Sequence, residues 1–437
     1  MQIDNISHIA GNALCTACGA CAGVCPSNAI EILTNTAGFL IADINNDKCI
    51  DCGKCAKICP SNPENKPSIE TNDIFHGTCL AGYVGYASDE TIRQKSQSGG
   101  IVTALLCYLL EQNEIEGAIV NNLNAQTRRP QAIFAPSKSE IIGACGSYYA
   151  QSPVAKTILE HSDKNTAAVV LGCQAESLHL IRENYPNITL PKYTIGLICA
   201  GQHSGNMIDD LITQSGCDAN QISEFRFRDK SHGWPGDVHV TTSTKDYWLP
   251  KESRLRLKQV YELHRCIICY DQMNIFSDIV CGDPWGISHK QQPKGHTIVI
   301  ARTETGRILL ENAAREGAII LEGLPIENLF TGQTVDGRHK TKFYTSREIF
   351  YENKWLFPYS GDYFENVSFT PANIMARKEL KERLIYSHDL YLTLDSQDYL
   401  RKINLKKKKL RGGYIHRAKR KMMPCIGAVL RKLSIIE

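Results

Sequence analysis

The chain has 437 residues, with 43% hydrophobic and 8% aromatic residues, which are ordinary values for a globular protein of two or three domains. Its longest apolar runs, such as residues 101–110, fall short of the roughly 20 residues that span a bilayer, so we expect no membrane crossing. Eighteen cysteines are unusual, and free thiols in such number are typical of a reducing cytoplasm. The net charge of +3 conceals a basic tail: residues 401–437 carry +12 and the rest of the chain −9.

A pattern of four cysteines is repeated near the start of the chain. The cysteines follow one another at offsets of three, three and four residues, each run ends in Cys-Pro, and the second run begins 34 residues after the first. Residues 15–28 match residues 49–62 at nine of fourteen positions. This is the spacing of a bacterial-type ferredoxin with two 4Fe-4S clusters, which pass single electrons. The eight cysteines are Cys15, Cys18, Cys21, Cys25, Cys49, Cys52, Cys55 and Cys59.

In this spacing the fourth cysteine of each run binds the cluster of the other run. We therefore expect Cys59 to join Cys15, Cys18 and Cys21, and Cys25 to join the remaining three. Gly19 and Gly53 are expected to permit close backbone approach to the clusters and amide hydrogen bonds to sulfur. The alternatives are structural zinc, which usually takes two pairs of ligands, and disulfides, which are typical of small secreted domains.

After a polar linker at residues 61–67, short segments rich in Val, Ile and Tyr alternate with segments of helical periodicity. This alternation predicts an α/β body. From about residue 340 the chain is charged, aromatic and poor in strand patterns, which predicts a helical, less ordered extension. The expected strands are residues 83–87, 117–121, 167–171, 193–199, 278–281 and 297–301, and the expected helices are residues 99–112, 154–161, 174–183 and 305–316.

A series of motifs in the body resembles a known family. In order they are SQSGGIVTALL (residues 96–106), GSYY (146–149), GCQ (172–174), GLIC (196–199), CIICYD (266–271), SDIVCGDPWG (277–286) and ART (301–303). The series, which covers about residues 75–330, is similar to the family formed by the β-subunits of deazaflavin (coenzyme F-420) hydrogenases and dehydrogenases. The resemblance implies two family domains, at residues 75–160 and 161–335. They would lie between a ferredoxin domain at residues 1–70 and an extension with a basic helical tail at residues 336–437.

The family resemblance implies FAD as a cofactor. Ser98, Gly99 and Gly100 precede a predicted helix whose free amides can hold an anion, here the diphosphate, and Thr103 would add a hydroxyl. The same glycines would also serve as a plain helix cap. A second loop would bring Gly146, Ser147 and Tyr148 to the flavin.

The chain departs from the family at two positions. Tyr148 stands where members commonly have lysine, and Gly172 where many have proline. The loss of that lysine removes a cation near the flavin or its redox partner, which concerns deazaflavin specificity more than flavin binding.

Four further cysteines fall within these motifs: Cys173, Cys199, Cys266 and Cys269. Two of them end predicted strands, and the strand ends of an open sheet gather at one edge. We infer a third 4Fe-4S cluster there, with zinc as the alternative, since four thiolates suit both. Five other cysteines are interpreted as buried structural residues: Cys79, Cys107, Cys145, Cys217 and Cys281.

Several polar residues near the motifs have two interpretations. A histidine near a flavin can donate a proton, although a surface or core histidine is more common. Asp283 and Trp285 would position a substrate or shield a cluster, or Asp283 would serve the turn at Pro284. The histidines concerned are His203, His232, His264 and His296.

The basic tail is interpreted either as a solvated, disordered segment or as a peripheral contact with a membrane surface or an acidic partner. Nucleic acid is not expected, because no recognition fold is visible. The predicted location is cytoplasmic, and the alternative is a membrane-peripheral location through the basic tail.

Together these features predict an iron–sulfur flavoprotein oxidoreductase. Electrons would pass between a redox donor, such as a ferredoxin or another redox subunit, and a deazaflavin-like or other small organic acceptor. The alternative is a non-catalytic electron-transfer subunit of a larger complex. The sequence gives no catalytic residue.

Overall fold

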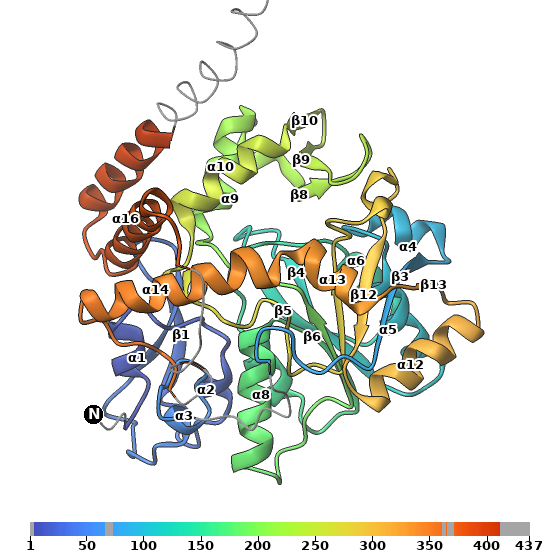
Figure 1. Ribbon diagram of the computed structural model, residues 1–437, viewed down its shortest axis with the longest axis horizontal. Coiled ribbons are helices and arrows are strands. Elements are labelled where there is room, and N and C mark those ends of the chain that lie inside the picture. The colour runs from blue at the N-terminus through green and yellow to red at the C-terminus, as the bar shows by residue number, and fades with distance from the viewer. Residues whose placement is uncertain (1–3, 66–72, 361–363, 365–370, 411–437) are drawn as a thin grey trace, which may run out of the picture.

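The computed structural model of the protein describes residues 4–65, 73–360, 364 and 371–410. Its centre is one mixed sheet in the order β13-β3-β12-β11-β7-β6-β4-β5 (Figure 1). Strands β4, β6, β7 and β11 are parallel, whereas β5 at one edge and β12, β3 and β13 at the other pair antiparallel. The strands are β3 (Ala81–Ala87), β4 (Gly117–Leu123), β5 (Pro130–Ala135), β6 (Thr166–Val170), β7 (Tyr193–Leu197), β11 (Ile279–Gly282), β12 (Thr297–Ala301) and β13 (Ile319–Gly323).

All six predicted strands and all four predicted helices are present, with ends that differ by one or two residues. The sheet takes strands from both predicted family domains, because β3 lies between β12 and β13. The β5 and β13 strands were missed. The predicted helices are α5 (Ile101–Glu111), α7 (Val154–Glu160), α8 (Gly172–Asn184) and α12 (Glu304–Arg315).

Helices cover both faces of the sheet because its central strands are apolar on both sides. One face packs on α4 (Glu90–Lys95), α5, α6 (Lys138–Gly143) and α12. The opposite face packs on α7 and α8 at one end, and near β3 and β12 on α13 (Ile326–Gln333) and α14 (Lys340–Glu352). Within the described residues, no helix is both long and apolar enough to cross a membrane.

The ferredoxin module packs directly on α7 and α8. The Ala155 amide donates to the Cys18 carbonyl over 2.9 Å, and a Cβ on Gly19 would meet the Cβ atom of Pro153 at 2.8 Å. Gly19 therefore permits close approach to the body, whereas the open side of Gly53 faces no neighbour nearer than 3.9 Å. The module contains α1 (Ser7–Gly11), α2 (Ala20–Gly23), β1 (Ile30–Thr34), β2 (Leu40–Ile44) and α3 (Lys54–Lys57).

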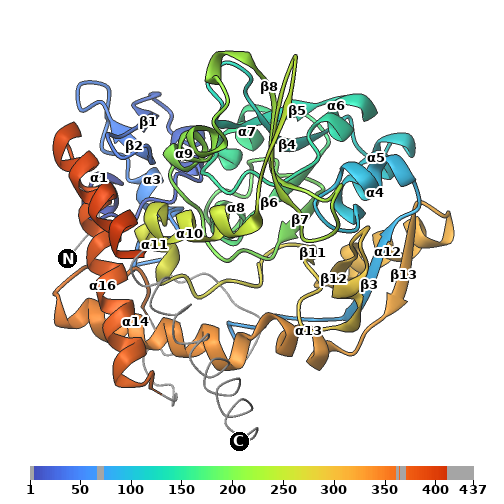
Figure 2. The ribbon, with the colours of Figure 1, turned by 90° about the horizontal axis from the view of Figure 1, so that it is seen from above.

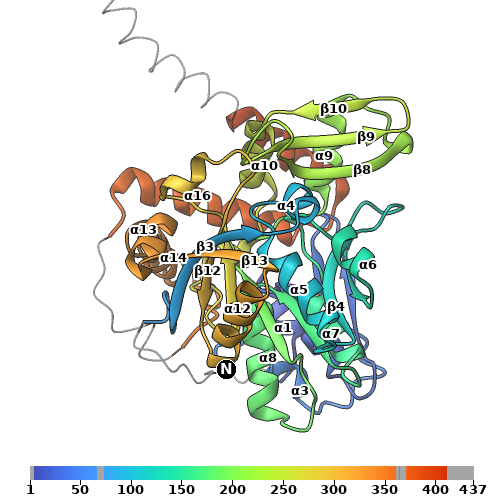
Figure 3. The ribbon, with the colours of Figure 1, turned by 90° about the vertical axis from the view of Figure 1, so that its right-hand side faces the viewer.

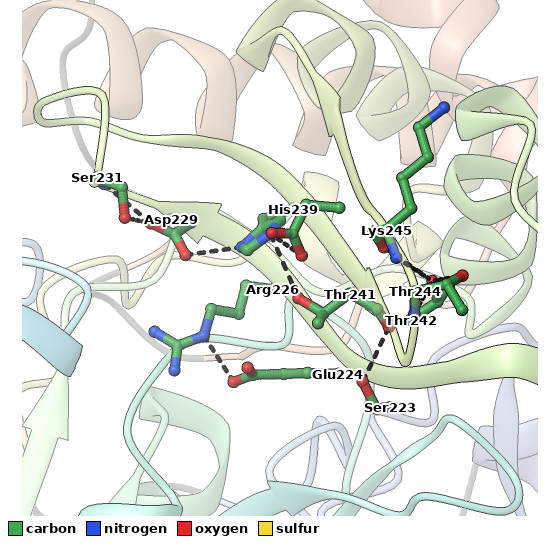
Figure 4. A network of polar contacts seen from close by, with 11 residues as sticks. Ser223, Glu224, Arg226, Asp229, Ser231, His239, Thr241, Thr242, Thr244 and Lys245 are labelled. Carbon is green, nitrogen blue, oxygen red and sulfur yellow. Dashed lines mark hydrogen bonds and ion pairs between the residues drawn. The ribbon is translucent and has the colours of Figure 1, made fainter.

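A second, antiparallel sheet of order β10-β9-β8 stands apart from the first and was not predicted (Figure 3). Its sequence is strongly polar, and a hydrogen-bonded network organises it (Figure 4). Asp229 accepts from the Ser231 amide at 2.8 Å and from His239 Nδ1 at 2.9 Å, which fixes the end of β8. The elements are β8 (Ile222–Asp229), β9 (Asp237–Thr242), β10 (Asp246–Leu249), α9 (Asn206–Ser215) and α10 (Lys251–Tyr261).

The described part of the C-terminal extension is helical, as expected; α14 packs on the body, and the end of α16 packs beside the ferredoxin module (Figure 2). The side-chain amide of Asn35 donates to the Tyr391 carbonyl at 2.8 Å. Nδ1 of His264 lies 3.0 Å from the Ser387 hydroxyl. The basic residues after 410 lie outside the described residues. The remaining helices are α11 (His264–Ile267), α16 (Ile374–Tyr391), residues 396–410, and the short turns Ala219–Gln221, Ser288–Gln291 and Val335–His339.

The contact of the module with α7 predicts different outcomes for two matched substitutions. Gly19 and Gly53 both have left-handed φ angles, 89° and 68°, so alanine costs each about 1–2 kcal/mol of backbone strain. Gly19→Ala adds a clash with Pro153 and Lys156, worth about a further 1–3 kcal/mol. We expect a clearly larger drop in apparent Tm for Gly19→Ala, measured by circular dichroism under anaerobic conditions. Equal drops would show that the module does not depend on this contact.

Candidate functional site

The first three cysteines of the first run converge with Cys59 in the buried part of the ferredoxin module. Burial raises the pKa of the Cys21 thiol well above its usual value, and the Cys18, Cys15 and Cys59 thiolates raise it further. Such crowded thiolates require a compensating cation to lose their protons, as in a metal cluster. The Ala17 amide donates to Cys15 Sγ at 3.3 Å.

The first three cysteines of the second run converge with Cys25 at the surface. Cys25, Cys49, Cys52 and Cys55 line one small hollow, and Cys52 is exposed. The Ala29 amide donates to Cys25 Sγ at 3.3 Å. The structure thus places each fourth cysteine with the three of the other run, which is the exchange that the spacing predicted.

The third group of cysteines comes together from three separated segments. Cys173 lies in the first turn of α8, Cys199 follows β7, Cys266 lies in α11, and Cys269 follows α11. Burial raises the pKa of Cys173 well above its usual value, and the thiolates of Cys18, Cys266, Cys199 and Cys269 raise it further. The strand-end argument therefore placed these four residues correctly in space.

The spacing of the sulfur atoms distinguishes a cluster from zinc. Tetrahedral zinc with Zn–S bonds of about 2.3 Å holds its thiolates about 3.8 Å apart. In the part of the chain that the structure describes, no three cysteine sulfurs lie within 4.8 Å of one another. None of the three groups therefore has the close sulfur spacing of a bound zinc ion.

The three groups form a series. The Cys55 thiolate of the surface group raises the pKa of Cys21, and the Cys18 thiolate raises the pKa of Cys173. Neighbouring groups are therefore close enough to interact electrostatically. Cys199 of the third group also lines a cavity of about 280 Å³ at the carboxyl ends of the parallel strands. The series therefore runs from the exposed Cys52 to this cavity.

The predicted flavin loops form much of the cavity wall. Ser98, Gly100 and Thr103 line it from the start of α5, and Gly146, Ser147 and Tyr148 line it from the second loop. Gly99 lies behind the wall, where its amide donates to the Thr297 hydroxyl at 2.9 Å. Gly100 caps α5 with φ 88° and no side-chain hydrogen bond, so the first amides of this helix remain available to an anion.

A lysine that the sequence did not reveal holds the first loop. The Lys230 ammonium donates to the Arg93 carbonyl at 2.5 Å, the Lys294 carbonyl at 2.7 Å and the Ser98 carbonyl. Burial lowers the pKa of Lys230 to about 8. The Ser98 hydroxyl donates to the His296 carbonyl, so it is engaged within the protein rather than free for a ligand. No motif marks Lys230, because its partners are backbone atoms far away in sequence.

Cys145 was expected to be a buried structural residue, and this expectation is wrong. It is half-buried and lines the cavity, 3.3 Å from the Thr103 hydroxyl and 3.6 Å from the Ser96 hydroxyl. Cys281 also borders the cavity, although it is only 2% exposed. Cys107 is buried in the core, as expected, while Cys79 and Cys217 are only partly buried.

An ion pair closes another part of the cavity wall. Arg228 of β8 binds Asp283 through contacts of 2.6 and 3.3 Å and lies 3.1 Å from the Tyr149 hydroxyl. Asp283 is therefore bound to a cation in addition to its place at the turn. Trp285 is partly exposed and contacts the Trp234 ring. The sequence had singled out Asp283 but not Arg228, which belongs to the unpredicted sheet.

Two other contacts connect the third cysteine group with its surroundings. The Gln202 amide donates to Cys266 Sγ at 3.3 Å, its side chain donates to Cys173 Sγ at 3.7 Å, and the residue also lines the cavity. A Cβ on Gly172 would lie 2.5 Å from the Asp271 carboxylate, so the missing proline leaves room for this carboxylate.

No described histidine lines the cavity. His203 binds the Tyr149 carbonyl through Nδ1 at 3.0 Å, and burial lowers its pKa to about 4. His264 is in the core, where burial lowers its pKa to about 3. His232 is largely exposed, and burial lowers the pKa of His296 to about 4.

A model of the 4Fe-4S dicluster domain matches residues 14–62, so the class is that of an iron–sulfur protein. The chain belongs to the family of coenzyme F420 hydrogenase/dehydrogenase beta subunits: the N-terminal model matches residues 82–158 and the C-terminal model residues 163–326. This confirms the family indicated by the motifs.

Named relatives agree with this membership. Coenzyme F420 hydrogenase subunit beta of Methanothermobacter thermautotrophicus is 27% identical over 56% of this chain and 84% of its own length. A subunit of the F(420)H(2) dehydrogenase of Methanosarcina mazei is 26% identical over 73% of this chain and 88% of its own length. A chain of the solved F420-reducing NiFe hydrogenase complex from Methanosarcina barkeri matches with a TM-score of 0.52 and 22% identity, over 67% of this chain and all of its own. That likeness concerns the fold alone.

The third cysteine group predicts a specific loss of iron. Cys266→Ser removes one thiolate of this group, so the iron content should fall from about twelve to about eight atoms per chain at four irons per cluster. Cys107→Ala is the matched control, because this buried thiol belongs to none of the three groups. Iron and sulfide analysis of anaerobic protein measures both. Equal iron contents in the two variants would show that the third cysteine group holds no cluster.

Proposed function

We propose that the protein is an iron–sulfur flavoprotein oxidoreductase that passes electrons between a protein redox partner and a small organic acceptor. The observation that supports this most strongly is the continuous series of three cysteine groups that ends at a cavity, with Cys199 belonging to both. A simple electron carrier needs no such cavity. The same cavity borders the two loops that the family resemblance connects with FAD.

The chemistry of the cavity suits a flavin dinucleotide. The uncapped start of α5 offers amides to a diphosphate. Gly146 has φ 129°, and a Cβ there would meet only the Tyr148 hydroxyl, at 4.0 Å, so this loop presents open backbone to a ligand. The volume of about 280 Å³ is at the low end for ligand pockets, so it would enclose part of the dinucleotide.

The residues of the chain have distinct tasks in this proposal. The twelve cysteines would hold three clusters. The backbone amides of Ala17, Ala29 and Gln202 donate hydrogen bonds to cysteine sulfur. Such bonds tune the reduction potential of a cluster. Lys230 holds the first cavity loop in place. A bound flavin supplies the exchange between one-electron and two-electron chemistry.

The redox partner would dock where Cys52 reaches the surface. Ile50, which is 64% exposed, lies beside it in the same hollow and offers an apolar contact. This place suits a ferredoxin or another redox subunit. The basic tail is a further proposed contact for an acidic partner or a membrane surface.

The acceptor at the cavity is either a deazaflavin or another organic compound. Relatives are named F420 hydrogenase, F420-dependent formate dehydrogenase and F420-dependent sulfite reductase, which favours a deazaflavin. Tyr148 favours a different acceptor, because it lines the cavity without the charge of the family lysine. Burial raises the pKa of Tyr148 to about 12, so it remains a neutral phenol.

A second function is a non-catalytic electron-transfer subunit. It is supported by the names of relatives, several of which are subunits, and by the solved chain that occurs in a hydrogenase complex. Such a subunit would hold clusters without its own acceptor.

The deciding experiment is anaerobic purification followed by measurement of iron, sulfide and flavin per chain. Bound FAD and turnover of reduced viologen with coenzyme F420 or another organic acceptor would support an enzyme. Clusters without flavin would refute the proposed function and leave the non-catalytic subunit.

The contacts of Lys230 predict a selective loss of flavin. Lys230→Met removes three charge-assisted hydrogen bonds that connect the Ser98 carbonyl of the first cavity loop with the Arg93 and Lys294 carbonyls, each worth about 1.5–3 kcal/mol. We expect a several-fold fall in flavin per chain with iron unchanged. Lys294→Met is the matched control, because within the described residues its exposed ammonium forms an ion pair with Glu90 alone, at 2.7 Å. Equal flavin content in the two variants would show that Lys230 does not shape the site.

A further inference from the structure

Tyr149 lies at the centre of a group of cations beside the cavity. Its ring borders the cavity, and its hydroxyl is 3.1 Å from Arg228. Arg254 and Lys258, both on α10, lie over the ring at 5.4 and 4.5 Å from its centroid. The φ angle of Tyr149 is 49°, a left-handed conformation that His203 holds with two hydrogen bonds to its carbonyl, at 2.9 and 3.0 Å.

The cations in this group lack sufficient negative partners. Arg254 is 5% exposed, its Nε has no hydrogen-bond partner, and neither it nor Lys258 has a carboxylate within 4 Å in the described part of the chain. They are four residues apart on one helix, where like charges repel. Asp283, the nearby carboxylate, uses both oxygens on Arg228. Unpaired buried cations are costly, so this place is built to stabilise a negative charge.

The other titratable residues of the cavity wall are poorly suited to exchange protons. Asp283 is held by Arg228, and Cys199 belongs to the third cysteine group. Burial raises the pKa of Tyr148, and Arg226 opposes this without outweighing it. The Cys145 thiol lies within hydrogen-bond distance of the Thr103 and Ser96 hydroxyls, and Cys281 is only 2% exposed. Among the described residues the wall contains no histidine or lysine. Tyr149 is therefore the cavity-lining acid whose conjugate base the surroundings stabilise best.

We propose that Tyr149 is the proton donor for the organic acceptor in the cavity. This inference rests on the proposed function. The acceptor takes two electrons and one proton as a hydride equivalent from the reduced cofactor and a second proton from the Tyr149 hydroxyl. Tyr149 is left as a phenolate beside Arg228 and regains its proton from solvent before the next turnover; oxidation of the reduced compound reverses these steps.

The charges around Tyr149 agree with this role. Burial alone would raise the pKa of Tyr149, but Arg228, Arg254 and Lys258 outweigh it and lower this pKa, while Asp283 opposes them. His203, whose pKa is about 4, stays neutral and adds no charge. A lower pKa brings the phenol closer to the pH at which general acids are efficient.

The two adjacent tyrosines allow a matched test. In full-length protein with its clusters, pH-dependent ultraviolet difference spectra report the formation of tyrosinate. Tyr149→Phe should remove the transition at lowest pH, whereas Tyr148→Phe should keep it. Arg254→Met with Lys258→Met should move it upward by about one pH unit or more, because nearby opposite charges shift a pKa by about 1–3 units. Tyr149→Phe should also remove one limb of the pH profile of turnover.

Flavin and iron are measured on the same samples. A wild type without flavin refutes the proposed function, whereas a flavin-containing wild type that has the same transition as Tyr149→Phe refutes this inference alone. A transition that Tyr148→Phe removes would assign the proton to the neighbour. A transition that does not move in the Arg254→Met, Lys258→Met variant would show that the cations serve another anion.

Discussion

The contact between the ferredoxin module and helices α7 and α8 is the constraint on which the rest of the structure depends. It brings the backbone of Cys18 to within 2.9 Å of Ala155 and thereby puts the first cysteine group beside Cys173. Gly19 and Gly23 make this approach possible, because side chains there would strike Pro153 and Leu159. Electron transfer weakens steeply with distance. This packing therefore matters for the proposed electron path, because it keeps the first cysteine group close to the third.

Buried positive charge is the second feature shared by the module and the body. Arg265, which is 1% exposed, donates to the Ser61 hydroxyl at 2.8 Å and the Pro60 carbonyl at 3.1 Å. Burial would lower the pKa of Arg265, but the Tyr359 phenol, the Cys269 thiolate, the Glu176 carboxylate and the Cys173 thiolate together raise it. Burial also raises the pKa of Glu176 to about 8, which limits its share as a negative partner near neutral pH. A cation buried in this way is stabilised by anionic cysteine groups, just as the cations around Tyr149 favour a phenolate.

Regular elements of the body were predictable because their signals are local. The central strands are apolar on both faces, and α5 and α12 have clear helical periodicity. The β8, β9 and β10 strands were missed because their apolar alternation is short: residues 225–227 and 238–240 alternate, but the flanking residues are mostly polar. Their order comes from cross-strand contacts such as that of His239 with Asp229, which have no local signal. The extension after residue 340 was predicted to be less ordered than its described part is. Its aromatic residues are ordered by packing with the main core, which the sequence alone does not reveal.

By itself the sequence determined the cysteine groups and the family, since ligand spacing is a property of the chain. It also indicated the two cavity loops, although it placed Cys145 in the core. The tertiary structure decided that the third group borders the cavity, that Lys230 holds the loop, and that Arg228, Arg254 and Lys258 surround Tyr149. These contacts join residues dozens to more than a hundred positions apart. The charge and burial of the residues around the cavity depend on which segments meet in space. The topology of the sheet and the position of α10 decide which segments meet.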